Sequence, residues 1–406
     1  MFSALLQRFR SLGPGLILAA AGIGAGDVVV ASVTGLRFGS TLLWAIALTA
    51  ALKFILTEAL ARWQLATGET VVRAWVTRLP RVVSVALAAY LVLWAYLVGA
   101  SLSSACGLAG ASLWPVLTVQ QWGVAHAVVA ALLVALNRFS AFQRVMKGLI
   151  AVMAICVAIC AVLAAPSWGE VATGLFVPRL TDGGGAAVLA LLGGIGGSVT
   201  VVCYGYWLKA AGWSGAGKLQ PVRADVRLAY LFTGLFGIAL CVIASSVHAE
   251  SASGTRIALE IAARLETVAG PFGRWVFLLG FWCTVFTAML GVWQGVPHIF
   301  AELTEAWGLA KPGPATRRVY LGALLWLAGP PLILLWFRQP VAVVVTFSIV
   351  GAFFMPFLAG TLLYLNNRRD WVGALANGRL GNGALLVCLA AFGIACLYEI
   401  VGVLNR

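Results

Sequence analysis

The chain of 406 residues is 62% hydrophobic and only 10% charged, with a mean hydropathy of +0.99. Soluble domains carry about 25% charged residues, so this composition excludes a water-soluble globular protein. The net charge of +14 does not indicate nucleic-acid binding, because the basic residues lie in short loops between apolar runs, where such residues set membrane topology.

The apolar residues form eleven runs, most of them roughly 20 residues long, the length of a helix that crosses a bilayer. Backbone groups in lipid must be satisfied within the segment, so the runs are predicted to be helices rather than the shorter, alternating strands of a barrel. Mixed charges between the seventh and eighth runs indicate a short surface helix. We expect membrane spans at residues 13–35, 40–66, 82–104, 122–137, 142–165, 187–209, 225–247, 271–300, 316–337, 340–365 and 383–404.

Two of the expected spans carry clusters of glycine at their centres. The first span reads GIGAGD from Gly22 to Asp27, and the sixth reads GGIGGS from Gly193 to Ser198. A glycine in a helix interior costs about 1 kcal/mol relative to alanine. Both helices are therefore predicted to unwind near the middle of the membrane.

The two glycine clusters also match each other, since the triplet GIG at residues 22–24 recurs at 194–196. The copies are an odd number of spans apart, so the second would run in the inverted direction. Paired broken helices in inverted repeats indicate the binding site of a transporter; the alternative, that the glycines only allow close helix packing, stays open. We expect a first repeat over residues 1–165, a second over 166–366 and an additional helix within 367–406.

Short motifs around the first break carry a resemblance to a known family. The chain reads GPG at residues 13–15, RFG at 37–39 and TLLW at 41–44, and MPF at 355–357 in the tenth expected span. In sequence and spacing these resemble the Nramp (natural resistance-associated macrophage protein) family of divalent-metal transporters. The resemblance implies an all-α polytopic membrane protein with about eleven helices, a LeuT-type 5+5 inverted repeat, and breaks in helices 1 and 6.

The first break departs from the family pattern. The family has Asp-Pro-Gly-Asn there, with the Asp and Asn binding metal, whereas this chain has Gly24 and Asp27 at those two positions and Ala25 in place of the proline. A carboxylate at a helix break inside a membrane is costly unless it is paired or used. Asp27 is therefore expected to be a cation ligand, helped by the carbonyls of Gly24 and Ala25, or to cap the second half-helix.

The sixth and tenth spans also differ from the family. The family's Met-Pro-His falls on a segment that includes Val201 and Cys203, so the thioether that favours soft metals is missing. Gly197 and Ser198 complete the expected substrate site, with Val201 at the third metal position, and a glutamine of the family falls near Ser348. In the family, acidic residues of the third span are tied to proton movement, and here those positions fall near Leu97 and Ala100. The resemblance therefore implies weak or absent proton coupling.

Three further charges lie within or beside expected spans. Lys53 and Glu58 in the second span do not share a helix face and are predicted to act as ion pairs with other helices or as a gate. If Lys53 reaches Asp27, it would stand in for a coupling cation or hold the site shut. Asp225 is expected to be a helix-start charge at the beginning of the seventh span.

The sequence therefore predicts a transporter of divalent metal cations, with magnesium or manganese favoured, working by alternating access around an altered metal site. The alternative is a transporter of a small organic solute, such as an amino acid or carboxylate, on the same fold; a sensor or intramembrane enzyme is a third option. No motif of a hydrolase or metalloprotease is present. No cofactor, structural zinc or disulfide is expected.

The charge bias predicts the orientation of the chain. Most of the Lys and Arg residues fall in the loops on the same side as the N-terminus. The positive-inside rule then places the N-terminus in the cytoplasm and the C-terminus outside. The predicted location is a bacterial inner membrane, with the lipid bilayer as the expected partner, no nucleic acid, and an oligomeric state that the sequence does not fix.

Overall fold

The structure is a computed structural model that describes residues 13–136, 139–246, 256–337, 347 and 350–404. Over these residues the chain forms helices and turns and no strand. Among the described residues, seven helices are long and apolar enough to cross a membrane, or up to nine if each bent pair counts as one span. The predicted all-α membrane fold is confirmed, whereas the count of eleven spans stays a prediction.

The first part of the chain contains the elements of expected spans one to five. The first span is a bent pair of helices, α2 and α3, whose axes differ by 63°. In order, the helices are α2 (Gly15–Gly22), α3 (Ala25–Phe38), α4 (Leu43–Thr67), α5 (Val71–Thr77), α6 (Arg81–Leu113), α7 (Val119–Ala135), α8 (Phe139–Leu163) and α9 (Trp168–Phe176).

The second part again begins with a broken helix, formed by α10 and α11. The long helix α13 bends at Ala269 and Gly270, where Gly270 has φ of +64°. The stretch of α13 before this bend occupies the segment in which mixed charges predicted a surface helix. In order, the elements are α10 (Gly184–Gly194), α11 (Thr200–Ala210), η1 (Ala216–Lys218), α12 (Leu219–Ser245), α13 (Arg256–Ala306), α14 (Pro314–Ala328), η2 (Pro330–Phe337), α16 (Phe354–Asn366), α17 (Arg369–Val372), η3 (Gly373–Leu375) and α18 (Arg379–Leu404).

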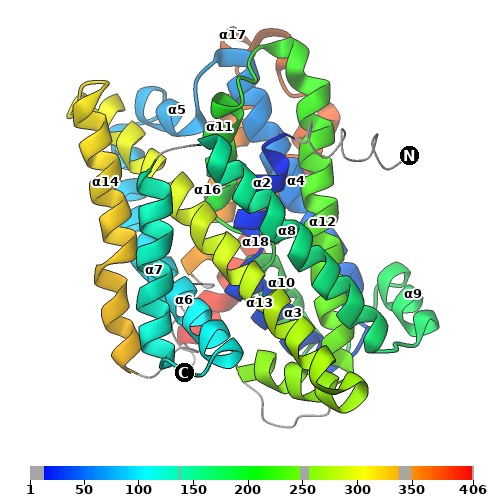
Figure 1. Ribbon diagram of the computed structural model, residues 1–406. Coiled ribbons are helices and arrows are strands. Elements are labelled where there is room, and N and C mark those ends of the chain that lie inside the picture. Colours follow the sequence, from blue (N-terminus) through cyan, green and yellow to red (C-terminus); the bar gives the residue numbers. More distant parts are fainter. Residues whose placement is uncertain (1–12, 137–138, 247–255, 338–346, 348–349, 405–406) are drawn as a thin grey trace, which may run out of the picture.

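The broken first span lies in the interior of the bundle, packed against α12 and α13 (Figure 1). Two glycines make this close packing feasible. A Cβ at Gly35 of α3 would overlap the backbone of Cys241 on α12, and a Cβ at Gly291 of α13 would overlap Ala21 of α2. Small residues therefore bring the backbones together, as is usual between membrane helices.

The two ends of the bundle carry different connections. The short helices α5 and α17 lie at one end and α9 lies at the opposite end (Figure 1). The sides of the membrane to which the charge bias assigns these loops stay a prediction. All eight cysteines are buried, so the thiols are packing groups of the interior.

Candidate functional site

The first helix break centres on Ile23 and Gly24. Helix α2 ends at Gly22, Ile23 is extended (φ −87°, ψ 105°), and Gly24 precedes the first residue of α3. A Cβ at Gly24 would approach the Cβ of Ala288 on α13 to 3.2 Å. The low helix propensity of glycine lets the chain leave the helix here, and the new helix begins with its free N–H groups inside the protein.

Asp27 connects the first break to the second. Its Oδ2 accepts a hydrogen bond from the N–H of Gly24 at 2.8 Å, and its Oδ1 accepts one from the N–H of Gly196 at 2.6 Å. Its side chain is buried, with the residue 4% exposed. The carboxylate therefore caps the start of α3, as expected of an acidic group at a helix N-terminus, and also binds the backbone of the other broken helix.

The second break runs from Ile195 to Val199. Ile195 is extended, and Gly196 and Gly197 have φ of +78° and +73°. Residues with side chains pay about 1–2 kcal/mol to adopt this left-handed region, so the two glycines are what permits the turn. A Cβ at Gly22 would lie 3.3 Å from the carbonyl of Gly196, so the two breaks contact each other directly.

Lys53 of α4 reaches the second break from the side. Its side chain is fully buried, and its Nζ donates hydrogen bonds to the carbonyl oxygens of Ile195 and Gly197, the latter at 2.6 Å. Lys53 and Glu58, which were predicted to act as ion pairs or as a gate, have different partners in the structure. Glu58 instead pairs with Arg62 at 3.3 Å and with Arg223 at 2.8 Å.

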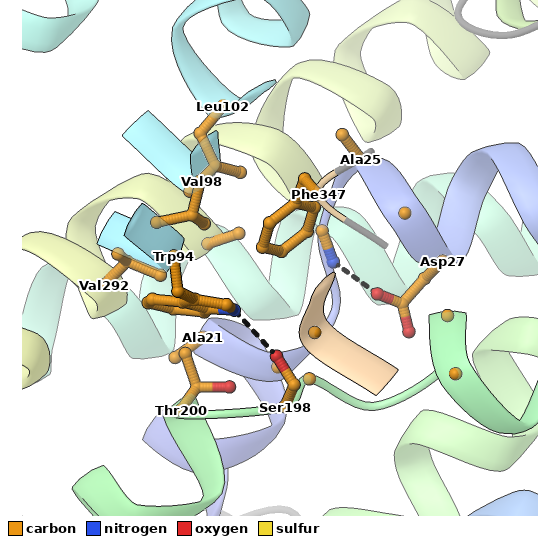
Figure 2. A pocket seen from close by; sticks show the side chains of 18 residues that line it. Ala21, Ala25, Asp27, Trp94, Val98, Leu102, Ser198, Thr200, Val292 and Phe347 are labelled. Carbon is orange, nitrogen blue, oxygen red and sulfur yellow. Dashed lines mark hydrogen bonds between the residues drawn. The ribbon is translucent and has the colours of Figure 1, made fainter. Parts of the chain in front are cut away.

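A buried cavity of about 40 Å³ lies between the two breaks. Figure 2 shows Asp27 on one side of it and Trp94, Val98 and Leu102 on the other. The Nε1–H of Trp94 donates to the hydroxyl of Ser198 at 3.2 Å. The lining residues are Ala21, Gly22, Gly24, Ala25, Gly26, Asp27, Trp94, Val98, Leu102, Gly193, Gly194, Gly197, Ser198, Thr200, Ala288, Val292, Phe347 and Gly351.

Few polar side chains face this cavity. Asp27, Ser198 and Thr200 supply oxygen atoms, and the Thr200 hydroxyl is buried with no hydrogen-bond partner among the described residues. A buried hydroxyl without a partner is costly and is therefore available to a bound ion or water. Within the described part of the chain, no group of three or more His, Cys, Asp or Glu residues is arranged to hold a metal.

The predicted site residues fall into three groups. Five of them line the cavity, namely Gly24, Ala25, Asp27, Gly197 and Ser198. Val201 and Cys203 are fully buried further along α11 and are not among the lining residues. Ser348 lies outside the described residues.

The apolar wall of the cavity was not predicted. It comes from α6 through Trp94, Val98 and Leu102, from α13 through Val292, and from Phe347. One signal was present in the sequence: Trp94 lies in the middle of an apolar span, whereas tryptophans that anchor membrane helices lie near the ends.

Comparison with known proteins places the fold. A family model described as natural resistance-associated macrophage protein-like (Nramp) matches residues 15–402. Among solved structures, a mutant of the Eremococcus coleocola manganese transporter has a TM-score of 0.80 at 15% identity, covering 97% of this chain and 86% of its own.

Two further solved structures share the architecture at lower similarity. A nucleobase-cation-symport-1 family transporter, in a closed conformation with bromovinylhydantoin bound, has a TM-score of 0.61 at 15% identity, covering 97% of this chain and 92% of its own. MhsT in complex with L-phenylalanine has a TM-score of 0.54 at 14% identity, covering 93% of this chain and 98% of its own. The comparison with curated proteins found no match. The predicted transporter fold with a broken first helix is confirmed.

Proposed function

Because the chain belongs to the natural resistance-associated macrophage protein-like family, we propose that it is a membrane transporter that moves divalent cations by alternating access. The supporting observation is that the two helix breaks meet at a buried cavity and that one carboxylate, Asp27, binds the backbone of both. Transporters of this architecture bind ions and solutes where discontinuous helices meet near the middle of the membrane. A buried carboxylate there is costly unless it has a role.

The proposed substrate is a hard divalent cation, magnesium or manganese. The side-chain atoms of the lining that can bind a cation are the oxygens of Asp27, Ser198 and Thr200. Hard cations prefer oxygen ligands. No methionine, cysteine or histidine occurs among the described lining residues. One water molecule needs about 10–15 Å³ of cavity volume. A cavity of about 40 Å³ therefore suits an ion that keeps only a few of its bound water molecules.

We propose that proton coupling is weak or absent. Asp27 is the single carboxylate among the described lining residues. Both of its oxygens already accept backbone hydrogen bonds, from Gly24 and Gly196. A proton route would need a series of titratable groups, and the described lining residues offer no second one.

Alternating access would use contacts at the end of α2 that is predicted to face the cytoplasm. The N–H of Gly15 donates to Asp225 Oδ2 at 2.7 Å, and the hydroxyl of Tyr204 donates to the same oxygen at 2.8 Å. Glu302 Oε2 accepts from the hydroxyls of Thr70 and Tyr206 at 2.5 and 2.6 Å. These bonds join α2 and α11 to α12, and α11 to α13, at this end. They would have to open for release into the cytoplasm.

The second candidate is a transporter of a small organic solute, such as an amino acid or carboxylate. The observation that favours it is the wall of Trp94, Val98, Leu102, Val292 and Phe347, because solute sites are mostly apolar with a few oriented polar groups. Free N–H groups at the half-helix ends suit a carboxylate. Such a substrate would require the cavity to widen.

Uptake into proteoliposomes separates the two candidates. Wild-type protein is compared with Asp27→Asn for uptake of magnesium, manganese, calcium and cadmium, with a pH dye inside the vesicles. Asp182→Asn is the matched control, because Asp182 is an exposed carboxylate outside the cavity lining. Thermal unfolding checks that each variant is folded.

Saturable cation flux that is lost in Asp27→Asn and kept in Asp182→Asn supports the proposal. A constant dye signal during that flux supports the absence of proton coupling. If no cation moves through the wild type, divalent-cation transport is wrong, and amino acids and small carboxylates are tested next.

The proposed location is a bacterial inner membrane, with the N-terminus in the cytoplasm and the C-terminus outside. The proposal is supported by the excess of Lys and Arg on the side of the N-terminus. Labelling of a tag at each end in intact cells measures the orientation directly.

A further inference from the structure

Lys53 is a buried cation whose partners are backbone oxygens. It belongs to α4, is 0% exposed, and its Nζ donates to the carbonyls of Ile195 and Gly197. The ion pairs of the described residues involve Glu58, Glu69, Glu266 and Glu305, and none joins Lys53 to a carboxylate within 4.0 Å. A charge inside a membrane is costly without compensation, so these carbonyls stabilise the ammonium together with the Asp27 carboxylate, which interacts with it electrostatically beyond ion-pair distance.

The second break explains why the carbonyls are available. Helix α10 ends at Gly194, and the last carbonyls of a helix lack partners within it and carry partial negative charge. The left-handed Gly196 and Gly197 then turn the chain so that the carbonyls of Ile195 and Gly197 reach the same nitrogen. Groups of backbone carbonyls at unwound helices are the usual ligands of small cations in such transporters.

The surroundings fix the lysine side chain in this position. A Cβ at Gly196 would lie 3.3 Å from Lys53 Cδ and 3.4 Å from both Tyr230 and Thr233, so the lysine stem is held within a packed layer. Asp27 binds the N–H of Gly196, the residue between the two carbonyls. One short segment therefore carries an anion on its N–H and a cation on its carbonyls.

We propose that the carbonyl oxygens of Ile195 and Gly197 form a cation site whose resident is the Lys53 ammonium. Removing the ammonium leaves a site for a free monovalent cation such as Na⁺. Lys53 is not among the residues that line the central cavity, whereas Gly197 is, so this site adjoins the one proposed for the substrate. If the proposed function holds, the consequence is a transport cycle that needs no free monovalent cation.

The test is cation-dependent thermal unfolding of purified protein, which requires neither a substrate nor flux. Lys53→Met keeps most of the side-chain stem and removes the charged donor. Melting temperatures of the wild type and Lys53→Met are compared in chloride salts of sodium, magnesium and choline at equal ionic strength. Lys218→Met is the matched control, since Lys218 is exposed near the start of α12.

We expect Na⁺ to raise the melting temperature of Lys53→Met by about 3 °C or more over choline in a saturable manner, and to leave the wild type and Lys218→Met unchanged. A folded Lys53→Met that no cation stabilises overturns the proposal. Stabilisation by magnesium but not by sodium also overturns it, because the carbonyls would then belong to a divalent site.

A second variant covers the case in which Lys53→Met does not fold. Lys53→Leu also removes the donor, with a shorter apolar side chain, and is measured in the same salts, with the same two outcomes. The result is independent of the proposed function: a sodium effect in a protein that moves no divalent cation would leave this inference standing and refute only the transport proposal.

Discussion

Asp225 holds the start of α2 in place, and its removal should destabilise the protein measurably. Asp225→Ala would leave two buried donors, the N–H of Gly15 and the hydroxyl of Tyr204, without their acceptor. An unsatisfied buried donor costs about 1–3 kcal/mol, so the free energy of unfolding should fall by about 2–6 kcal/mol. Tyr204→Phe removes one donor and keeps the bond from Gly15, and should cost about 1 kcal/mol.

Thermal unfolding in detergent, followed for the two single variants and the double variant, measures these effects. The unfolding entropy grows with chain length, so one kcal/mol corresponds to about 1 °C in a chain of 406 residues, and Asp225→Ala should lower the melting temperature by about 2–7 °C. The double variant should lose less stability than the two single variants lose in sum, because both substitutions remove the hydrogen bond between Tyr204 and Asp225. The exposed Asp182→Ala serves as the control.

Two results would refute this account of Asp225. The first is an Asp225→Ala protein that melts within about 1 °C of the Asp182→Ala control. The second is a double variant whose loss equals the sum of the losses of Asp225→Ala and Tyr204→Phe. Either would mean that the hydrogen bonds between these helices do not carry the stability assigned to them.

Two further predictions concern the second break and the cavity. Gly196→Ala forces a side chain into a φ of +78°, which should lower the free energy of unfolding by about 1–2 kcal/mol and reduce transport. The control Gly185→Ala lies within α10 with open space around it and should stabilise the protein by about 0.5–1 kcal/mol. Equal melting temperatures of the two variants would contradict the strain at Gly196. Trp94→Phe removes the donor to Ser198 and should weaken substrate affinity in uptake assays more than it lowers the melting temperature, and an unchanged apparent affinity would argue that Ser198 needs no positioning.

The helix breaks and the fold were predictable from local sequence. Clusters such as GIGAGD and GGIGGS predict a helix break from a few residues alone, because glycine lowers helix stability wherever it occurs. Asp27 was identified for the same reason, as an acidic residue beside a break. Its contact with Gly196 on the other broken helix depends on how the two repeats pack and could not be read from either segment.

The partners of Lys53 and Asp225 show where sequence reasoning stopped. Lys53 was expected to form an ion pair with another helix or to reach Asp27. It interacts with Asp27 only electrostatically, and its hydrogen bonds go to the carbonyls of Ile195 and Gly197. Every residue has a backbone carbonyl, so the amino-acid sequence does not show which carbonyls will accept a hydrogen bond from a buried lysine. Asp225 was expected to be a helix-start charge, but α12 begins at Leu219 and the carboxylate caps α2, because caps in a bundle need not come from the same helix.

The burial of every thiol makes the native chain a convenient background for labelling. All eight cysteines are buried, so a water-soluble maleimide should react slowly with the resting protein. A single cysteine introduced at an exposed position would then be the principal reactive group, with no need to replace the others. Cys203 on α11 packs against Gly295 of α13, so an increase in its labelling under transport conditions would report that these two helices separate.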